Sequence, residues 1–308
     1  MSKKISIVIP VYNEAGNLKI ILHAIKKVFE SLPYDFSIIF VNDGSQDETL
    51  NIIKKLSEEN NEVGYISFSR NFGHQNALKA GFDSSNADAV ISMDGDMQHP
   101  PTVIPELINL WENGNDIVYT IRKDHKELPM LKRTTSNLFY KIMNQLSSIE
   151  LERGTADFRL LDKKVVNVLR DIKEYDLFWR GMVKWLGFKQ ISIEYSPAER
   201  ASGKSKYTIK KMLELALRGI TSFSTKPLSI AIYIGFLSSL ISILYIPYAL
   251  VSYFYGHVIS GWASIIVTIA FFGGLQLMIL GIIGIYLGKL FMQSKNRPHY
   301  IVNESKLT

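Results

Sequence analysis

The feature that most constrains this chain is a long uncharged stretch near its C-terminal end. Residues 227–288 include no Asp, Glu, Lys or Arg, and His257 is the only titratable side chain there apart from tyrosines. Two apolar runs within it each exceed the roughly 20 residues that a helix needs to cross a bilayer. The sequence therefore predicts a transmembrane region over 227–290, with helices at about 228–253 and 262–288.

Basic residues on both sides of this stretch predict its orientation. Lys226 precedes it, and Lys289, Lys295 and Arg297 follow it. Positively charged flanks stay on the cytoplasmic side of a membrane. The two helices are therefore expected to form a hairpin in the cytoplasmic membrane, a multi-pass arrangement with both chain termini in the cytoplasm.

Glycines in the second apolar run allow close contact between helices. Gly284 and Gly288 are four residues apart, with Gly273, Gly274 and Gly281 upstream. Small residues at this spacing let two helix backbones approach each other. Two readings stay open: tight packing within the hairpin, or self-association into a homo-oligomer.

An amphipathic segment lies directly ahead of the uncharged stretch. Over 209–223 apolar residues recur at three- and four-residue steps, and Lys210, Lys211, Glu214 and Arg218 fall between them. This pattern is typical of a helix that lies in a membrane interface with its cations toward lipid headgroups. An ordinary surface helix packed on the domain would show the same pattern, but the position favours the membrane.

These observations divide the chain into four parts. A soluble catalytic domain is expected over 1–206, a juxtamembrane helix over 207–226, the transmembrane pair over 227–290 and a cytoplasmic tail over 291–308. The net charge of +6 suits anionic lipid or phosphorylated small molecules. Nucleic acid is not an expected partner, because the basic residues are not interleaved with aromatics on a recognisable binding module. The lack of cysteine excludes disulfides and thiolate chemistry.

The first part of the chain alternates β-branched apolar runs with segments of helical spacing. This alternation predicts an α/β fold with a doubly wound, mainly parallel sheet. Ser45, with Glu48 three residues on, predicts a capping box at the start of the second helix. Strands are expected at 5–11, 36–41, 63–68, 89–93, 116–121 and 189–195, helices at 17–30, 45–56, 73–82, 103–111, 129–146 and 175–185, and a glycine-led loop at 154–160.

Two carboxylates end the fourth predicted strand. Asp94 and Asp96 flank Gly95, and Pro100 and Pro101 then forbid the strand from continuing. Open α/β sheets bind ligands at the carboxyl ends of their strands. Two acids so close repel each other unless a cation lies between them, and oxygen ligands of this kind suit Mg²⁺ or Mn²⁺. The alternative is a solvated Asp-Gly turn that caps the next helix.

Other strand ends carry acids to the same edge. Glu14 follows the first strand and Asp43 follows the second. Together with the aspartate pair they predict one polar site. A Gly-x-Gly-x-x-Gly or P-loop phosphate motif is absent, so neither a usual dinucleotide fold nor a P-loop ATPase is indicated.

Five motifs, in order, resemble those of a known enzyme family. They are Ile9-Pro10-Val11-Tyr12-Asn13-Glu14, Val41-Asn42-Asp43-Gly44-Ser45, Arg70-Asn71-Phe72-Gly73, Met93-Asp94-Gly95-Asp96-Met97-Gln98-His99-Pro100-Pro101, and Arg200-x-x-Gly203-x-Ser205-Lys206-Tyr207. The chain resembles the family 2 glycosyltransferases of GT-A type, within the polyprenyl-phosphate group that includes bactoprenol glucosyltransferases and dolichyl-phosphate mannosyltransferase. Each motif is weak alone, and their order makes the resemblance specific.

The resemblance implies roles for individual residues on the donor side. The cofactor it implies is a divalent metal, Mg²⁺ or Mn²⁺. Nucleotide-sugar contacts are implied for Pro10, Tyr12, Glu14, Val41, Asp43, Asp94, Gly95 and Asp96, and metal ligation for Asp94, Asp96 and Gln98.

It also implies roles on the acceptor side. Arg122, Arg200 and Lys206 would grip phosphates of the donor or of the lipid acceptor, where the alternative is a solvated basic surface. Asp96 and Asp157 are the implied catalytic residues. Asp157 would act as a base or position the acceptor, and the alternative is a salt bridge to Arg159 or a helix cap.

The function implied is an inverting transfer of a hexose, glucose from UDP-glucose, onto undecaprenyl (bactoprenol) phosphate at the cytoplasmic membrane face. Mannose from GDP-mannose and a modified aminopentose are alternative sugars. A processive polysaccharide synthase is disfavoured, because Phe178-Trp179-Arg180-Gly181 lacks the glutamine of a Gln-x-x-Arg-Trp motif and reverses its order. A catalytically silent membrane scaffold is the alternative from another class.

Overall fold

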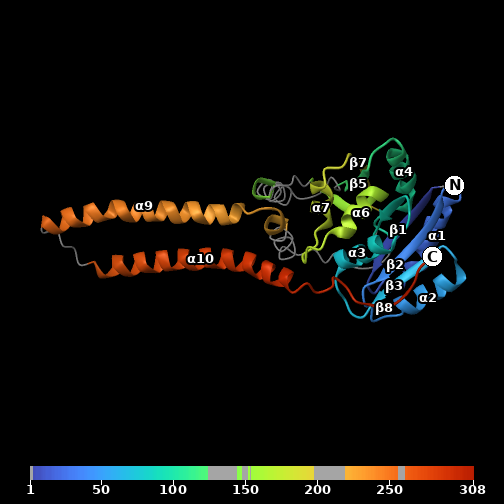
Figure 1. Cartoon of the computed structure of the whole chain (residues 1–308), viewed down its shortest axis with the longest axis horizontal. Helices are drawn as coiled ribbons and strands as arrows, with labels where there is room; N and C mark the ends of the chain where they lie inside the picture. Colours follow the sequence, from blue (N-terminus) through green and yellow to red (C-terminus); the bar gives the residue numbers. More distant parts are fainter. Residues whose placement is uncertain (1–2, 124–143, 148–151, 153, 198–218, 256–260) are drawn as a thin grey trace.

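The computed structural model describes residues 3–123, 144–147, 152, 154–197, 219–255 and 261–308 (Figure 1). In these ranges one mixed sheet has the strand order β7-β5-β6-β4-β1-β2-β3-β8. The strands are β1 Lys4–Val11, β2 Asp35–Asn42, β3 Val63–Phe68, β4 Ala89–Ser92, β5 Ile117–Arg122, β6 Thr155–Asp162, β7 Gln190–Tyr195 and β8 Val302–Lys306.

The centre of the sheet is parallel, as the alternating pattern predicts. β1 pairs parallel with both β2 and β4, and β2 pairs parallel with β3. β6 runs antiparallel between β4 and β5. The carboxyl ends of β1, β2 and β4 therefore meet at one edge, where their acids were expected to gather.

Helices cover both faces of the sheet. Their apolar residues recur at helical spacing, so each helix buries one face against the strands. One core contains residues of α1 Leu18–Phe29, α2 Thr49–Glu59 and α4 Ile104–Glu112, the last preceded by a short 3₁₀ turn at Pro101–Val103. The other core contains residues of α3 His74–Ser84, α6 Lys163–Asp171 and α7 Trp179–Trp185.

Two local predictions are wrong. The predicted loop at 154–160 is strand β6, and Gly154, with φ of 80°, makes only the turn before it. The predicted capping box is also absent. α2 begins at Thr49, and the Ser45 hydroxyl instead accepts a hydrogen bond from the backbone N–H of Asn13 at 3.0 Å. Asn13 has φ of 56°, and this turn takes the hydroxyl that the cap would have used.

Other predictions shift or lie outside the described residues. α7 begins at Trp179 rather than at 175, and α6 was not predicted. Most of the predicted helix at 129–146, and most of the amphipathic segment, lie outside the described ranges. Residues 219–223 at the end of that segment are helical.

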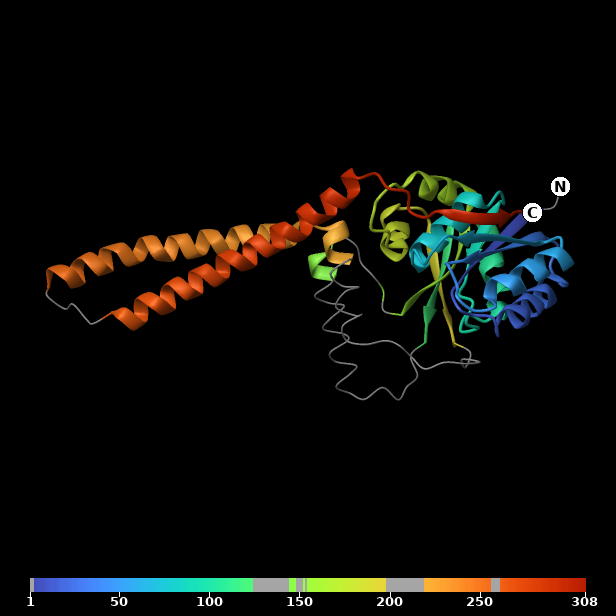
Figure 2. The ribbon, with the colours of Figure 1, turned by 90° about the horizontal axis from the view of Figure 1, so that it is seen from below.

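Two long helices follow, α9 Lys226–Phe254 and α10 Trp262–Ser294. They extend away from the sheet beside each other (Figures 1 and 2). Among the described residues one helix is long and apolar enough to cross a membrane, over Ile265–Ser294 with mean hydropathy 2.3. The apolar part of α9 is shorter, Lys226–Ile241. A second crossing therefore stays a prediction.

The segment after α10 returns to the sheet. β8 pairs antiparallel with β3. Figure 2 shows the chain after α10, in red, running back to the domain that contains the sheet. Just ahead of it, the Tyr300 ring stacks on Phe68 with centroids 5.0 Å apart, and its hydroxyl donates to Asp83 Oδ2 at 2.9 Å. The stretch 291–308, expected as a cytoplasmic tail, contributes the last strand of the sheet.

Candidate active site

The loops after β1 and β2 are tied together by side chains. The Asn13 side-chain oxygen accepts from the backbone N–H of Gln46 at 2.9 Å, and Thr49 Oγ1 accepts from the N–H of Glu14 at 2.9 Å. Tyr12 is exposed beside this junction, with 41% of its surface accessible. The segments 12–14 and 45–49 therefore form one connected surface, which we name the ledge, and the Tyr12 ring on it is exposed to solvent.

Asp43 holds a third motif against this ledge. Its carboxylate accepts from the backbone N–H groups of Phe72 at 2.6 Å and of Gly73 at 3.0 Å. Burial raises the pKa of Asp43, and the two N–H donors offset part of that effect. The next residue, Gly44, has φ of 68°, and a Cβ there would lie 2.4 Å from the carbonyl carbon of Arg70. We name this contact between 43–44 and 70–73 the clasp.

Asp94 lies at the end of β4 between two histidines. His74 Nε2 is 2.8 Å from its Oδ1, and His99 Nε2 is 3.6 Å from its Oδ2. His99 is fixed by stacking on Phe158 and by its Nδ1, which accepts from the Asp94 backbone N–H. Although desolvation raises the pKa of Asp94, His99 and His74 outweigh it and hold that pKa well below its usual value. Desolvation likewise lowers the pKa of His74, but Asp94 outweighs it and raises that pKa.

Asp96, Gln98 and Arg122 meet beside Asp94. Asp96 Oδ1 accepts from the Gln98 backbone N–H at 3.1 Å, and Arg122 Nη1 donates to Gln98 Oε1 at 3.2 Å. Gly95 leaves room for this turn, since a Cβ there would lie 2.8 Å from a Val11 methyl carbon. The structure thus joins two of the predicted metal ligands, Asp96 and Gln98, to one predicted phosphate-binding arginine.

Asp157 lies across the sheet from Asp94, because β6 pairs with β4 in the register Arg159 to Ser92. It is buried between two guanidinium groups. Arg159 Nη2 is 3.0 Å from its Oδ1, and Arg180 Nη2 is 2.9 Å from its Oδ2. Burial raises the pKa of Asp157, but Arg180 and Arg159 outweigh it and lower the pKa to about 2.

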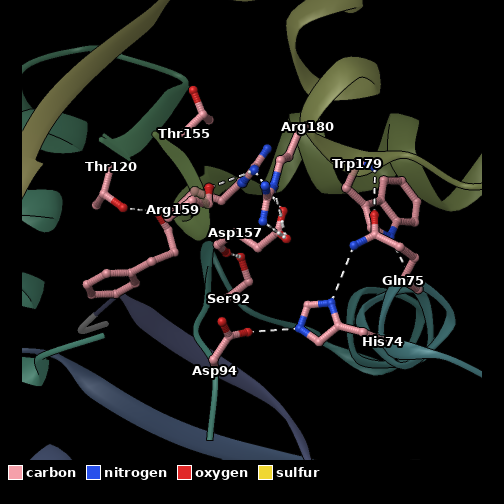
Figure 3. A network of polar contacts seen from close by, with 12 residues as sticks. His74, Gln75, Ser92, Asp94, Thr120, Thr155, Asp157, Arg159, Trp179 and Arg180 are labelled. Carbon is pink, nitrogen blue, oxygen red and sulfur yellow. Dashed lines mark hydrogen bonds and ion pairs between the residues drawn. The ribbon is translucent and has the colours of Figure 1, made fainter. Parts of the chain in front are cut away.

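Gln75 joins the Asp94 side of the site to the Asp157 side (Figure 3). Its Nε2 lies 3.3 Å from His74 Nδ1. Its Oε1 accepts from the Trp179 backbone N–H at 2.9 Å, and its carbonyl oxygen accepts from the Trp179 indole N–H at 2.8 Å. The first turn of α3 and the first turn of α7 are thereby locked together.

The chain is similar in sequence to known proteins over nearly its whole length. Residues 6–170 match the family described as glycosyl transferase family 2. The bactoprenol glucosyl transferase of Shigella phage SfV is 41% identical, over 98% of this chain and 99% of its own length. The uncharacterized glycosyltransferase YkcC of Bacillus subtilis is also 41% identical, over 97% and 93%. This chain belongs to glycosyl transferase family 2.

Membership in this family confirms the enzyme class and fold class that the motifs implied: the chain is a glycosyltransferase with the α/β fold of GT-A type. Among solved structures, a mannosyltransferase from Pyrobaculum calidifontis, in complex with GDP-Man and Mn²⁺, is similar at 13% identity. It covers 72% of this chain and 64% of its own, with a TM-score of 0.48.

Not every predicted site residue of this glycosyltransferase lies at an open surface. Pro10 and Val41 are buried and pair across β1 and β2. Arg200 and Lys206 lie outside the described residues. The roles given to individual site residues stay predictions.

Sequence reasoning missed His74, Gln75 and Arg180. His74 directly follows the Arg70-Asn71-Phe72-Gly73 motif, and that position was the signal that could have found it. Arg180 carries no such signal. Its partner Asp157 belongs to a different element, and only the fold brings the two together.

Proposed function

We propose that this family 2 glycosyltransferase moves a hexose, glucose from UDP-glucose, onto a polyprenyl (bactoprenol) phosphate at the cytoplasmic face of a membrane. The observation that carries the proposal is a pair of carboxylates held by basic side chains, Asp94 just after β4 and Asp157 near the start of β6, in a chain that also has an apolar helix over Ile265–Ser294. Full-length similarity to the bactoprenol glucosyl transferase of phage SfV supports it. α9 and α10 would together form the membrane hairpin.

The donor would bind at the ledge and at the turn after β4. The lowered pKa keeps Asp94 ionised at neutral pH, as a metal ligand must be. The described residues include no group of three or more His, Cys, Asp or Glu side chains suited to a metal. Asp94, Asp96 and the Gln98 amide oxygen nevertheless fit Mg²⁺ or Mn²⁺, since such ions bind one or two carboxylates and complete their shell with waters and substrate phosphates. When bound there, the ion would neutralise charge on the departing nucleoside diphosphate.

The acceptor would approach from the Asp157 side. A phosphate monoester, with a second pKa of about 6, is already anionic near neutrality and needs no strong base. Its oxygen would attack the anomeric carbon opposite the leaving group and invert it. A carboxylate with a pKa of about 2 is a weak base. We therefore assign Asp157 to holding Arg180 in place, where that cation faces the incoming phosphate.

The test is to incubate the solubilised protein with a panel of labelled nucleotide sugars, polyprenyl phosphate and Mg²⁺ or Mn²⁺, and to identify the lipid product. With UDP-glucose as the donor, the expected product is polyprenyl glucosyl phosphate. A lipid product carrying only mannose or an aminopentose would replace glucose in the proposal. Lack of transfer from every donor, together with lack of nucleotide-sugar binding by calorimetry, would instead indicate a silent scaffold.

One variant tests the donor side directly. Asp96→Asn is expected to reduce transfer by at least about a hundredfold, the scale on which removal of one electrostatic contact to the reacting groups acts. Membrane insertion should be unchanged. Asp171→Asn, an exposed position at the end of α6, is the matched control. Transfer by Asp96→Asn at the rate of that control would remove Asp96 from the site.

A further inference from the structure

The connection between α6 and α7, residues 172–178, is held in place from α10. It has no helix or strand of its own, so its backbone groups need partners elsewhere. Gln293 of α10 supplies two of them. Its Oε1 accepts from the Tyr175 backbone N–H at 2.6 Å, and its Nε2 donates to the Lys173 carbonyl oxygen at 2.8 Å. One side chain thus fixes the connection through two bonds of opposite direction.

A second α10 residue contacts the same connection. Lys289 lies one turn before Gln293, on the same face of the helix. Its Nζ is 3.1 Å from Asp176 Oδ2 and donates to Ser222 Oγ at 3.0 Å. An ion pair that is partly exposed to water adds little stability by itself. Its effect here is to fix where α10 sits against the connection.

The other end of the connection leads straight into the active site. α7 starts four residues after Tyr175, and its first two residues are Trp179, bonded to Gln75, and Arg180, bonded to Asp157 (Figure 3). Gly181 packs so closely on Phe223 that a Cβ would lie 2.5 Å from the ring. All of these contacts lie within the first three residues of a helix that is seven residues long.

We propose that Gln293 and Lys289 are positioning residues for sugar transfer: by fixing 173–176, they place Arg180 against Asp157. The position of α10 against residues 173–176 would then determine the position of Arg180 relative to Asp157. A shift of α10 along its axis would displace the start of α7 and lengthen the Arg180–Asp157 contact. The activity part of this inference rests on the proposed function, and the structural part does not.

The experiment compares three variants of the full-length protein in lipid nanodiscs. Gln293→Ala removes both bonds to the connection. Gln293→Glu keeps the acceptor for Tyr175 N–H and loses the donor. Ser294→Ala is the matched control, because Ser294 Oγ donates within α10, to the Phe291 carbonyl. Amide hydrogen exchange is followed in peptides covering 173–177 and 178–184, and transfer is followed as kcat and KM.

Gln293→Ala is expected to speed exchange in both peptides and to lower kcat about tenfold, with KM for the nucleotide sugar unchanged, since small misplacements act on the transferred group. Gln293→Glu should restore part of the protection, and Ser294→Ala should match the wild type. Faster exchange confined to 173–177, or a wild-type kcat beside faster exchange at 178–184, would overturn the inference. If the wild type transfers no sugar, the proposed function fails, and the exchange data still decide whether α10 and α7 are coupled.

Discussion

Two buried carboxylates of this glycosyltransferase face opposite electrostatic surroundings. Asp43 and Asp157 are 3% and 5% exposed, so water does little for either. Asp43 accepts from backbone N–H groups, and burial raises its pKa. Asp157 contacts Arg180 and Arg159, and its pKa falls to about 2. At Asp43 the two backbone N–H donors offset only part of the cost of burial, whereas at Asp157 the two guanidinium groups more than offset it.

The difference separates two tasks. The clasp around Asp43 joins the end of β2 to the loop before α3, and so shapes the surface that we assign to the nucleotide. Asp157 binds Arg159 and Arg180 at the place that we assign to the acceptor phosphate. Removal of the charge should therefore matter little at Asp43 and much at Asp157. Four measurements test this contrast, from the largest expected effect to the smallest.

Asp157→Asn should have the largest effect. It leaves Arg159, which is 2% exposed, without a counter-charge, and breaking a buried ion pair costs about 3 kcal/mol or more of unfolding free energy. The kcat of transfer should fall more than the affinity for the nucleotide sugar. Chemical denaturation and steady-state kinetics measure the two effects. Adding Arg159→Met should recover stability without recovering kcat, and wild-type kinetics in the single variant would remove Asp157 from the site.

Gly44→Ala tests the clasp without touching a charge. The left-handed backbone and the approach to Arg70 leave no room for a methyl group, so we expect a loss of about 2 kcal/mol. Gly16→Ala is the control, since a Cβ there meets nothing within 4 Å. Thermal unfolding of both variants provides the comparison. Equal stability of the two would mean that the clasp gives way easily.

The loss of folding stability in acid should depend on Asp157. Between pH of about 4, the unfolded value for aspartate, and pH of about 2, its pKa here, the unfolded chain binds more protons than the folded one. Stability is therefore lost as pH falls through this window, by on the order of 2 kcal/mol from this group. The raised pKa of Asp43 acts oppositely and favours folding at low pH. Unfolding midpoints of wild type and Asp157→Asn should converge as pH falls; parallel curves would contradict the assignment.

Asp43→Asn should have the smallest effect. The amide oxygen can still accept from the Phe72 and Gly73 N–H groups, so the expected loss is about 1 kcal/mol or less. Asp43→Ala, which leaves both donors without this acceptor, should cost more. Nucleotide binding by calorimetry distinguishes the two roles of this residue. A large loss of affinity in Asp43→Asn with little change in stability would show that its charge contacts the ligand.

The same contrast explains how much could be predicted from the sequence. β1 to β4 were predicted within one or two residues, because each is a β-branched apolar run buried on both faces. β6 was not. Its alternation places Asp157 and Arg159 inside the protein, and charged residues in a short segment resemble a loop until Arg180 is known to reach them. A local sequence pattern predicts well which apolar groups are buried. It predicts poorly which charged residues from distant segments will pair.

β8 escaped prediction for a different reason. Its residues are mostly polar and exposed, as an edge strand allows, and its pairing partner β3 lies at the far end of the chain. The turn carrying Asp94 and Asp96 was predicted because its residues are contiguous. His74, one of the two histidines beside Asp94, was missed because it belongs to α3.

The return of the chain at β8 changes what the long helices are. Because α9 and α10 lie in sequence between β7 and β8, they form one excursion out of a single sheet rather than an appendage at its end. To separate the sheet domain from the helices, a protease would have to cut both before α9 and after α10. Strand β8 would then remain paired with β3 in the sheet. A truncation at the end of α10 would instead strip the cover from β3 and leave an open edge prone to aggregation.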